Sequence, residues 1–469
     1  MEEPDSTSSS CVVVTCKLNE DKLIVIESFV AFHLASGFDH IYICVDSDTL
    51  GLEFFSWLSA VYCPKYLSII RPLEGDRFQQ QHCPASYRQA AHVREHEVQV
   101  RQLLNVEMCE VLAAQQGLRW ILHIDMDELF YLGPQANSSA VALHFASLEA
   151  QNIGTLTYAN HEAVPETVDC VDYYRALTLF RRHHFQLQLS TATTAGMNYW
   201  TQRTTYHQYF LLYDCGKSAS RTGIGALPSS VHQFKLAKIR SGNEAKDSLQ
   251  ARAALIDPRH LSLESVLHLQ DGYPCVLHYG CPGISWLHDK YSILGNFPDY
   301  WKMLDGTDLP IAQSFHLECR DAVHEGCPEQ IRTLFEQQVL FPVSDGTELK
   351  KQLECGVLMR IDGPSVFLTR VQRHGLFCRS EGENGATTAI VGTARVALLR
   401  QIMDQCALDA SMQGAVEPAA NIPVHERGAE CDGANNNQGS AVSQSPLHGR
   451  GISPADRLRL ISQSAFQFL

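Results

Sequence analysis

The sequence lacks the features that define several protein classes. No apolar run is long enough to cross a membrane, and residues 1–10, which we expect to be a polar leader, contain no apolar signal core. No Cys-x-x-Cys pair occurs among the 16 cysteines, which argues against a structural zinc site. Basic residues are scarce, with 37 Lys and Arg against 52 Asp and Glu. We therefore expect a soluble, cytoplasmic protein with reduced thiols, no membrane segment and no nucleic-acid partner.

The chain does contain enough apolar sequence for a large folded unit. Of its 469 residues, 45% are hydrophobic, as in globular proteins with a core. The residue pattern predicts a buried strand at 11–16, a helix over 22–36 and a strand at 40–46. A strand, a helix and a strand in such close succession indicate a βαβ unit and a parallel sheet. We therefore expect an α/β fold, with a Rossmann-like, mostly parallel sheet and flanking helices.

The rest of the chain is expected to continue this fold and then to change character. The pattern predicts further strands at 67–72 and 153–158 and a long helix over 92–116. Residues 303–412 are expected to form a smaller C-terminal extension of helices and strands. Residues 413–469 are rich in Gly, Ala, Asn, Ser and Pro and are expected to be mostly disordered.

Residues 120–130 are the most informative stretch, because an apolar, strand-like run there carries three acids. These acids are Asp125, Asp127 and Glu128. An unpaired buried carboxylate is very costly, whereas acids at a strand end can bind a hard divalent cation. Asp125 and Asp127 are two residues apart and so face the same side of a strand. The spacing predicts a site for Mn²⁺ or Mg²⁺, and a solvated surface turn is the alternative.

Polar side chains follow two other strands of the predicted sheet. Asn19 and Glu20 come after the strand at 11–16, and Asp46 ends the strand at 40–46. Ligands of open parallel sheets bind at the carboxyl ends of the strands. If these strands are neighbours, their end groups converge with the acids on one crevice that suits a nucleotide. Asp46 would accept from the base or ribose, and the acids would hold a metal on the diphosphate.

In this order, the residues resemble those of the family 2-like and family 92-like glycosyltransferases, which have the GT-A fold. The resemblance covers roughly residues 11–302 and rests on Asn19, Glu20, Glu27, His33, Gly37, Asp46, Asp125 to Phe130, Gly216 to Arg221, Val231 to Phe234, Leu277 to Tyr279, Trp286 and Lys290. It implies a GT-A domain over 11–302 and a hexosyltransferase-type activity. The donor would be a UDP- or GDP-sugar, and the acceptor a hydroxyl of a glycan, a protein or another molecule. It also makes the Golgi an alternative location.

The resemblance implies a role for each strand-end group. Asp125 and Asp127 would bind Mn²⁺ or Mg²⁺ across the nucleotide diphosphate, where the metal acts as a Lewis acid on the leaving group. Asp127 would thereby be catalytic. Asn19, Glu20, Asp46 and Asp125 would contact the nucleotide sugar.

A late histidine often completes the metal shell in enzymes of this kind. His278, at a predicted strand end, is the candidate for this third ligand. His207 and His232 are the alternatives. His33 is different, because it lies on the apolar face of the helix over 22–36, where a core histidine is expected.

A basic segment, Gly216-Lys217-Ser218, is similar to the end of a P-loop. A P-loop needs a glycine five residues before Gly216, but Leu211 stands there, inside an apparent strand at 209–213. Lys217 and Arg221 remain, in an expected flexible turn, as two cations that could neutralise a diphosphate. A plain basic surface loop is the alternative.

An inverting glycosyl transfer also needs a base that deprotonates the acceptor hydroxyl. Glu162 is the candidate, with His161 and Glu166 as substitutes, and a merely solvated glutamate is the alternative. Trp200 and Trp286 could stack on a sugar, but core packing is the expected role of both.

Two functions of other classes stay open. A haloacid-dehalogenase-like phosphatase would be phosphorylated on the first Asp of the Asp-x-Asp, but Leu129 stands where that motif has Thr or Val, and the chain contains no Asp-Asp pair. A non-catalytic GT-A-like module that binds nucleotides or glycans is the other alternative. The intact pair Asp125 and Asp127 argues against it.

Overall fold

A computed structural model gives the fold. It describes residues 8–17, 22, 24–46, 51–71, 84, 86–93, 97–188, 190–236, 252–253, 273–303, 306–342, 345–377 and 390–414. Asn19, Glu20 and residues 415–469 of the expected disordered tail lie outside these ranges, whereas residues 413–414, also expected to belong to the tail, end a helix.

The larger of the two main sheets has seven strands, in the order β12-β6-β9-β4-β1-β2-β3. In chain order these strands are β1 (Ser10–Cys16), β2 (His40–Val45), β3 (Leu67–Ile70), β4 (Trp120–His123), β6 (Ile153–Tyr158), β9 (Lys217–Arg221) and β12 (Arg252–Ala253). Strands β3, β2, β1 and β4 run parallel, and β9 runs antiparallel to both of its neighbours. The α/β class with a Rossmann-like, mostly parallel sheet is therefore confirmed.

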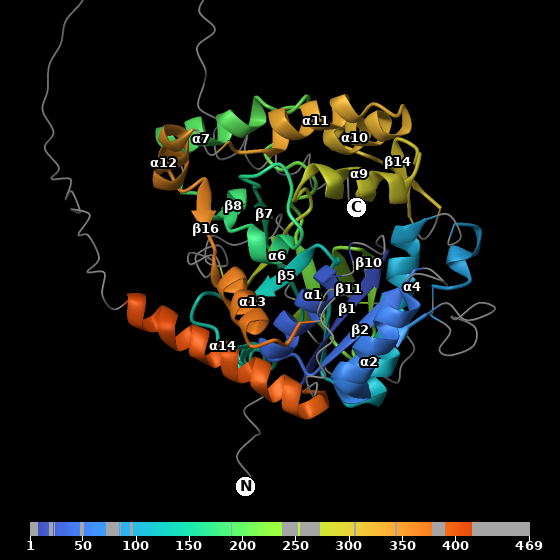
Figure 1. The fold of residues 1–469 in the computed structure, drawn as a ribbon. Helices are drawn as coiled ribbons and strands as arrows, with labels where there is room; N and C mark the ends of the chain where they lie inside the picture. Colours follow the sequence, from blue (N-terminus) through green and yellow to red (C-terminus); the bar gives the residue numbers. More distant parts are fainter. Residues whose placement is uncertain are drawn as a thin grey trace, which may run out of the picture.

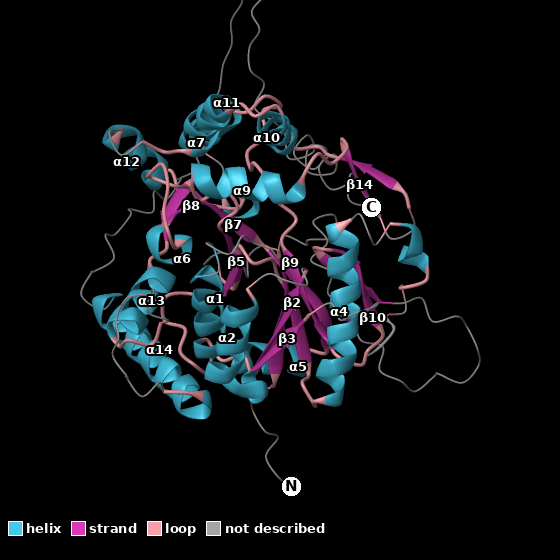
Figure 2. Ribbon diagram, turned by 45° about the vertical axis from the view of Figure 1, so that its right-hand side comes forward, coloured by secondary structure: helices cyan, strands magenta, loops and turns pink. Residues whose placement is uncertain are grey.

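Alternate residues of β1 pack on opposite faces of this sheet, as a strand with two buried faces requires. Val12 and Val14 join a core that includes residues of the helices on one face, whereas Cys11 and Val13 join residues of a helix on the other face. The first face is covered by α1 (Ile24–Ala35), α2 (Leu52–Tyr66) and α5 (Ala140–Ala150), and the second by α4 (Val98–Gln115). Figure 2 shows α4 running along the sheet on the side away from α13 and α14.

A second, five-stranded sheet has the order β16-β8-β7-β13-β5. Its strands are β5 (Glu128–Tyr131), β7 (Asn160–Ala163), β8 (Leu179–Arg181), β13 (Cys275–His278) and β16 (Leu358–Arg360). Further elements are α6 (Tyr173–Ala176), α7 (Thr191–Thr201), α9 (Ile284–Leu294), α10 (Ser314–His324), α11 (Pro328–Leu334) and α12 (Gly346–Glu354), short helices at Gln89–His92, His184–Gln186 and Phe335–Val339, and the strand pairs β10 (Ala226–Ser230) with β11 (Gln233–Leu236) and β14 (Tyr300–Lys302) with β15 (Asp308–Pro310). Figure 1 shows α7, α9, α10 and α11 as a layer above the seven-stranded sheet.

The last helices of the described chain lie against the first ones. Helices α13 (Gly363–Arg373) and α14 (Gly392–Gly414) contact α1, and α14 also contacts α2 (Figure 1). Phe367 of α13 and Leu399 of α14 belong to the same hydrophobic core as Val12 of β1. Part of the expected C-terminal extension is thus packed into the core of the N-terminal part.

The structure corrects four local expectations. The run at 120–130 is two strands, because the chain turns at the acids and β5 enters the second sheet. The segment at 209–213 is a loop, the expected flexible turn at 216–221 contains β9, and α2 at Leu52–Tyr66 was not predicted. Within the described ranges, no helix combines the length and apolarity that membrane crossing requires.

Candidate functional site

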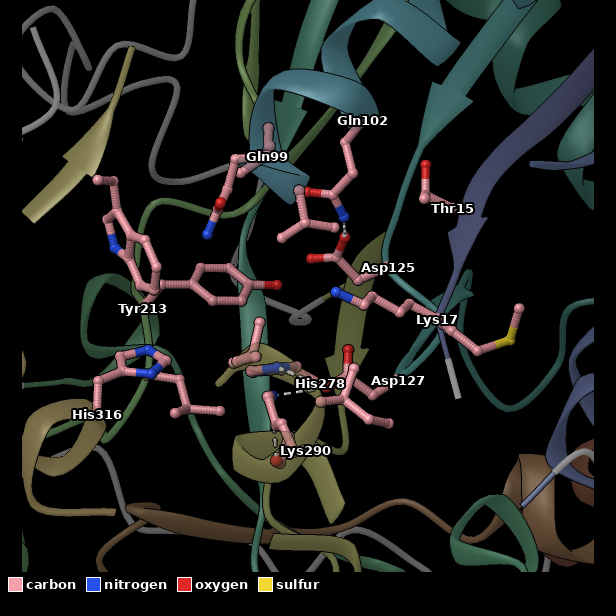
Figure 3. A pocket seen from close by; sticks show the side chains of 18 of the residues that line it. Thr15, Lys17, Gln99, Gln102, Asp125, Asp127, Tyr213, His278, Lys290 and His316 are labelled. Carbon is pink, nitrogen blue, oxygen red and sulfur yellow. Dashed lines mark hydrogen bonds and ion pairs between the residues drawn. The ribbon is translucent and has the colours of Figure 1, made fainter. Parts of the chain in front are cut away.

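A cavity of about 300 Å³ opens at the carboxyl ends of β1 and β4. Thr15 and Lys17 at the end of β1, Asp125 and Asp127 after β4, and the first turn of α4 form its wall toward the sheet. Helices α9 and α10 and strand β14 close the opposite side. Figure 3 shows the two aspartates facing this space, with His316 across it. The cavity therefore lies where open α/β sheets bind their ligands.

Asp125 is fixed by two neighbours. Lys217 Nζ lies 2.5 Å from Asp125 Oδ2, and Gln102 Nε2 donates to Asp125 Oδ1 at 2.8 Å. Partial burial alone would raise the pKa of Asp125, but the Lys217 ammonium holds it below its usual value. Asp125 is therefore an oriented carboxylate, with its side chain 27% exposed to the cavity.

Asp127 also has two neighbours, one from α9 and one from the end of β13. Lys290 Nζ of α9 donates to Asp127 Oδ2 at 3.0 Å, and His278 Nε2 at the end of β13 lies 3.7 Å from the same oxygen. Burial opposes ionisation of Asp127, yet Lys290 and His278 together lower its pKa below the usual value. The sequence prediction that His278 lies beside the acids agrees with this placement.

Glu128 does not reach the cavity. Its side chain is fully buried, and its Oε2 accepts from the Asp125 backbone N–H at 2.6 Å and lies 3.6 Å from Lys217 Nζ. Burial raises the pKa of Glu128 well above its usual value, although Lys217 opposes the shift. Glu128 therefore supports the turn at residues 125–127, the acidic turn, through a buried hydrogen bond to its backbone.

The turn is also held by its backbone. The hydroxyls of Tyr173 and Tyr174 both donate to the carbonyl of Met126, the residue between the two aspartates. The backbone N–H of Tyr279 donates to the carbonyl of Asp127 at 2.7 Å. Because both tyrosines are buried, these hydrogen bonds hold the backbone between the two aspartates in place.

We expect the Tyr173→Phe/Tyr174→Phe variant to loosen this turn. Removal of both hydroxyls leaves the Met126 carbonyl without these donors, which costs about 1–3 kcal/mol in a buried setting. Urea unfolding should show this loss, and backbone hydrogen exchange over residues 125–128 should become faster. Tyr206→Phe, on a side chain that is 62% exposed, is the control. Unchanged exchange in the double variant would remove the two tyrosines from the support of the turn.

The donor set is compatible with a divalent cation held together with a ligand. The described part of the chain contains no group of three or more His, Cys, Asp or Glu side chains that could hold a metal by itself. Asp127 and His278 nevertheless place one carboxylate and one imidazole side by side. Mg²⁺ is commonly bound by one or two carboxylates, with phosphate oxygens and water completing its shell. The residues present therefore fit a metal that a diphosphate helps to coordinate.

Three of the predicted nucleotide contacts, Asp46, Lys217 and Arg221, do not line the cavity, and the Lys217 side chain is fully buried behind Asp125. Asp46 does not line the cavity and instead forms a two-pronged ion pair with Arg101, with Nη2 to Oδ2 at 2.7 Å. Arg221 lies opposite Trp120 in the pairing of β9 with β4, at the far end of β9 from Lys217. The side chains of Lys217 and Arg221 therefore do not act on one ligand. Asn19 and Glu20 lie outside the described residues.

Glu162, the predicted base, is a structural residue. Its side chain is 4% exposed and forms an ion pair with Arg181 at 2.6 Å. Its oxygens also accept from the backbone N–H groups of Leu211 and Leu212. These contacts occupy the carboxylate that would have to accept a proton.

The two substitutes for Glu162 are also engaged. His161 is fully buried, and its Nδ1 accepts from the backbone of His183. Glu166 pairs with Arg360 and does not line the cavity. The expected core role of Trp200 is confirmed, since it is fully buried, whereas Trp286 is buried in the core but also lines the cavity.

The remaining histidines differ in position. His33 is fully buried and bonded through both ring nitrogens to the backbones of Phe29 and Phe130, so its expected core role is confirmed. His207 Nδ1 lies 3.2 Å from the carbonyl of Thr201, the last residue of α7, and His207 does not line the cavity. His232 lines the cavity, where burial and Lys217 lower its pKa to about 3, and its Nδ1 lies 3.0 Å from the Gly216 carbonyl.

Sequence reasoning missed most of the residues that line the cavity. Four that bear on its chemistry are Lys17, Gln102, Asp289 and Trp301. Lys17 directly follows β1, so its place after a predicted strand could have marked it. In Figure 3 its side chain extends toward Asp125 and Asp127. The other three come from helix α4 and from the layer above the sheet, and only the tertiary fold brings them to the acids.

Comparisons with known proteins give distant relatives. The chain is 24% identical over 286 residues to Glycosyltransferase-like At3g57200 of Arabidopsis thaliana, which covers 60% of this chain and 48% of that protein. It is 22% identical over 286 residues to Glycosyltransferase-like At2g41451 of the same plant, covering 60% of this chain and 54% of the relative. The chain thus spans about half the length of these relatives. No family model matches it.

Solved structures give a weaker likeness. Core-mannan synthase A (CmsA/Ktr4) from Aspergillus fumigatus, in a Mn/GDP form, matches 36% of this chain and 46% of its own at 13% identity, with a TM-score of 0.20. The mannosyltransferase Ktr4p from S. cerevisiae in complex with GDP matches 46% of this chain and 52% of its own at 10% identity, with a TM-score of 0.19. Scores this low carry no conclusion about the present chain.

Proposed function

We propose that the protein is a metal-dependent GT-A glycosyltransferase, which moves a sugar from a UDP- or GDP-sugar to a hydroxyl acceptor. The observation that carries the proposal is the pair Asp125 and Asp127 at the carboxyl end of a parallel strand, open to a cavity and fixed by side chains from three directions. The similarity to the two glycosyltransferase-like plant proteins supports the same reaction class. We further propose that the protein is related to the family 2-like and family 92-like glycosyltransferases.

The charges of the cavity suit an anionic donor. Although the chain carries a formal charge of −15, four lysines and three aspartates line the cavity. The first turn of α4 opens on the same space, and the N-terminus of a helix favours negative charge. A diphosphate would therefore meet Lys17, Lys290 and a helix N-terminus, which compensate the nearby aspartates.

In this proposal Asp127 and His278 would hold Mn²⁺ or Mg²⁺ together with the diphosphate, with Asp125 beside them. The bound ion would supply Lewis acidity to the departing nucleoside diphosphate. Lys290 orients Asp127, and Lys217 and Gln102 orient Asp125, so the carboxylates need no rearrangement when the donor arrives. Lys17 adds a positive charge near the leaving group.

A turnover screen tests the proposal. The protein is incubated with UDP- and GDP-sugars in Mn²⁺, and release of the nucleoside diphosphate is measured with water and with a panel of methyl glycosides as acceptors. We expect release from at least one donor, and loss of that release in excess EDTA. Release from none of the donors would contradict the proposed reaction.

A further inference from the structure

The cavity has two chemically different walls. The wall at the sheet carries the acids and Lys17, whereas the opposite wall, built from α9, α10 and β14, combines apolar and aromatic side chains with Asp289, Lys290 and Lys302. If the diphosphate lies at the acids, as proposed above, the reacting sugar carbon lies between these walls. The second wall is then where an acceptor can approach.

Helix α9 presents one continuous face to the cavity. Trp286, Asp289, Lys290 and Ile293 stand at helical spacing, and all four line the cavity. Lys290 reaches Asp127 from this face (Figure 3). Asp289, the residue before Lys290, is therefore within the same cavity as the acidic turn.

Asp289 is the one carboxylate of the described cavity wall that lies outside the acidic turn. Its side chain is 23% exposed, and its Oδ2 lies 3.6 Å from Lys22 Nζ. Lys22 is itself placed by Ser285, whose Oγ it meets at 3.1 Å, and by the face of Trp286. His288 Nδ1 lies 3.7 Å from the other oxygen, Oδ1. Unlike Glu162, Asp289 combines a defined position with access to the cavity.

A half-buried aromatic side chain stands on the same wall. Trp301 of β14 lines the cavity and stacks on Phe297, with ring centroids 4.8 Å apart. His316 of α10 meets the Trp301 ring edge-on at 6.1 Å. A rigid ring held in this way gives a flat apolar surface with little entropy left to lose on binding. The apolar face of a sugar ring fits such a surface.

We propose that this wall is the acceptor subsite, that it takes a saccharide stacked on Trp301, and that Asp289 is the catalytic base of an inverting transfer. The inference rests on the proposed function. Asp289 takes the proton of the acceptor hydroxyl while the acceptor oxygen forms a bond to the anomeric carbon of the donor. The bond from that carbon to the phosphate oxygen breaks, and its electron pair leaves with the nucleoside diphosphate. The proton remains on Asp289 until solvent removes it.

The test compares Asp289→Asn with the wild type in donor hydrolysis and in transfer to methyl glycosides. We expect kcat to fall by about 10²–10⁴-fold, the usual contribution of a positioned base. The thermal shift caused by the nucleoside diphosphate and Mn²⁺ should stay unchanged, because the groups proposed to hold the diphosphate are Asp127, His278 and the lysines, and not Asp289. Asp299→Asn, an aspartate in an ion pair with Arg320 and outside the cavity lining, is the matched control.

Azide provides a second arm, because this nucleophile has no proton to lose. In Asp289→Ala, added azide should form a glycosyl azide of inverted configuration at a rate that removal of Asp289 does not lower. Trp301→Ala should raise KM for the methyl glycoside and leave KM for the donor unchanged.

Three results would overturn the assignment: an Asp289→Asn kcat within a few-fold of the wild type, loss of nucleotide binding together with kcat, or a product of retained configuration. A wild-type protein that binds nucleotide but turns over no donor would also count against Asp289. A wild type that binds no nucleoside diphosphate would instead contradict the proposed function.

Discussion

Asp127→Asn should lose about 10³-fold in turnover and show no thermal shift with nucleoside diphosphate and Mn²⁺. The substitution keeps the size of the side chain and removes the charge that faces the proposed metal and Lys290. Charge stabilisation by a bound ion is worth several kcal/mol, and each 1.36 kcal/mol is tenfold in rate. Donor turnover and differential scanning fluorimetry measure the two effects.

The fold should survive this substitution, because the Asp127 side chain is 23% exposed and lies at a cavity. Asp409→Asn is the matched control, since Asp409 also forms an ion pair, with Arg370, but on the surface between α13 and α14. Full turnover in Asp127→Asn would disprove the role of the acidic turn. Loss of the folded state would assign Asp127 a structural role.

The second large effect concerns stability. Arg395 of α14 is 4% exposed, and its Nη2 lies 2.7 Å from Oε1 of Glu27, which is fully buried in α1. Arg395→Met leaves the Glu27 carboxylate buried without this cation, which typically costs about 3–5 kcal/mol. Because whole domains are stable by about 5–15 kcal/mol, chemical denaturation should show a large drop in the free energy of unfolding.

Two variants identify the cause of that drop. The double variant Glu27→Gln/Arg395→Met removes the buried charge as well and should recover much of the loss. Arg370→Met breaks the surface pair with Asp409 and should cost no more than about 1 kcal/mol. An equal loss in Arg395→Met and Arg370→Met would mean that the buried pair does not tie α14 to α1.

The first βαβ unit could be predicted from the sequence because each of its elements has a clear local pattern. The apolar run of β1, the helix ending before Gly37 and the strand that ends at Asp46 appear in the structure with bounds close to those expected. The place of Asp125 and Asp127 at the end of a buried strand could be predicted for the same reason, because the apolar run before them has a clear strand pattern. Local pattern could not show that the chain changes sheets at these acids, because both segments are apolar strands.

The partners of the acids could not be predicted. Asp46 directly follows β2, and Glu162 lies within β7. The sequence gives no sign that Arg101 forms an ion pair with the first and Arg181 with the second. Asp289 looks like an ordinary charged residue of a helix until α9 is placed over the sheet. Which acid is buried in an ion pair and which faces a cavity is decided by tertiary packing alone.

Calorimetric titration of the protein with UDP and with GDP, each in Mn²⁺ and in EDTA, measures directly whether the acidic turn binds a nucleoside diphosphate through a metal. We expect one of the two to bind in Mn²⁺ with a Kd between about 1 µM and 1 mM, the range in which enzymes usually have their KM values. We further expect binding at least tenfold weaker in EDTA and none to Asp127→Asn. No binding of either nucleotide in Mn²⁺, or equal binding to the wild type and Asp127→Asn, would contradict this role of the acidic turn.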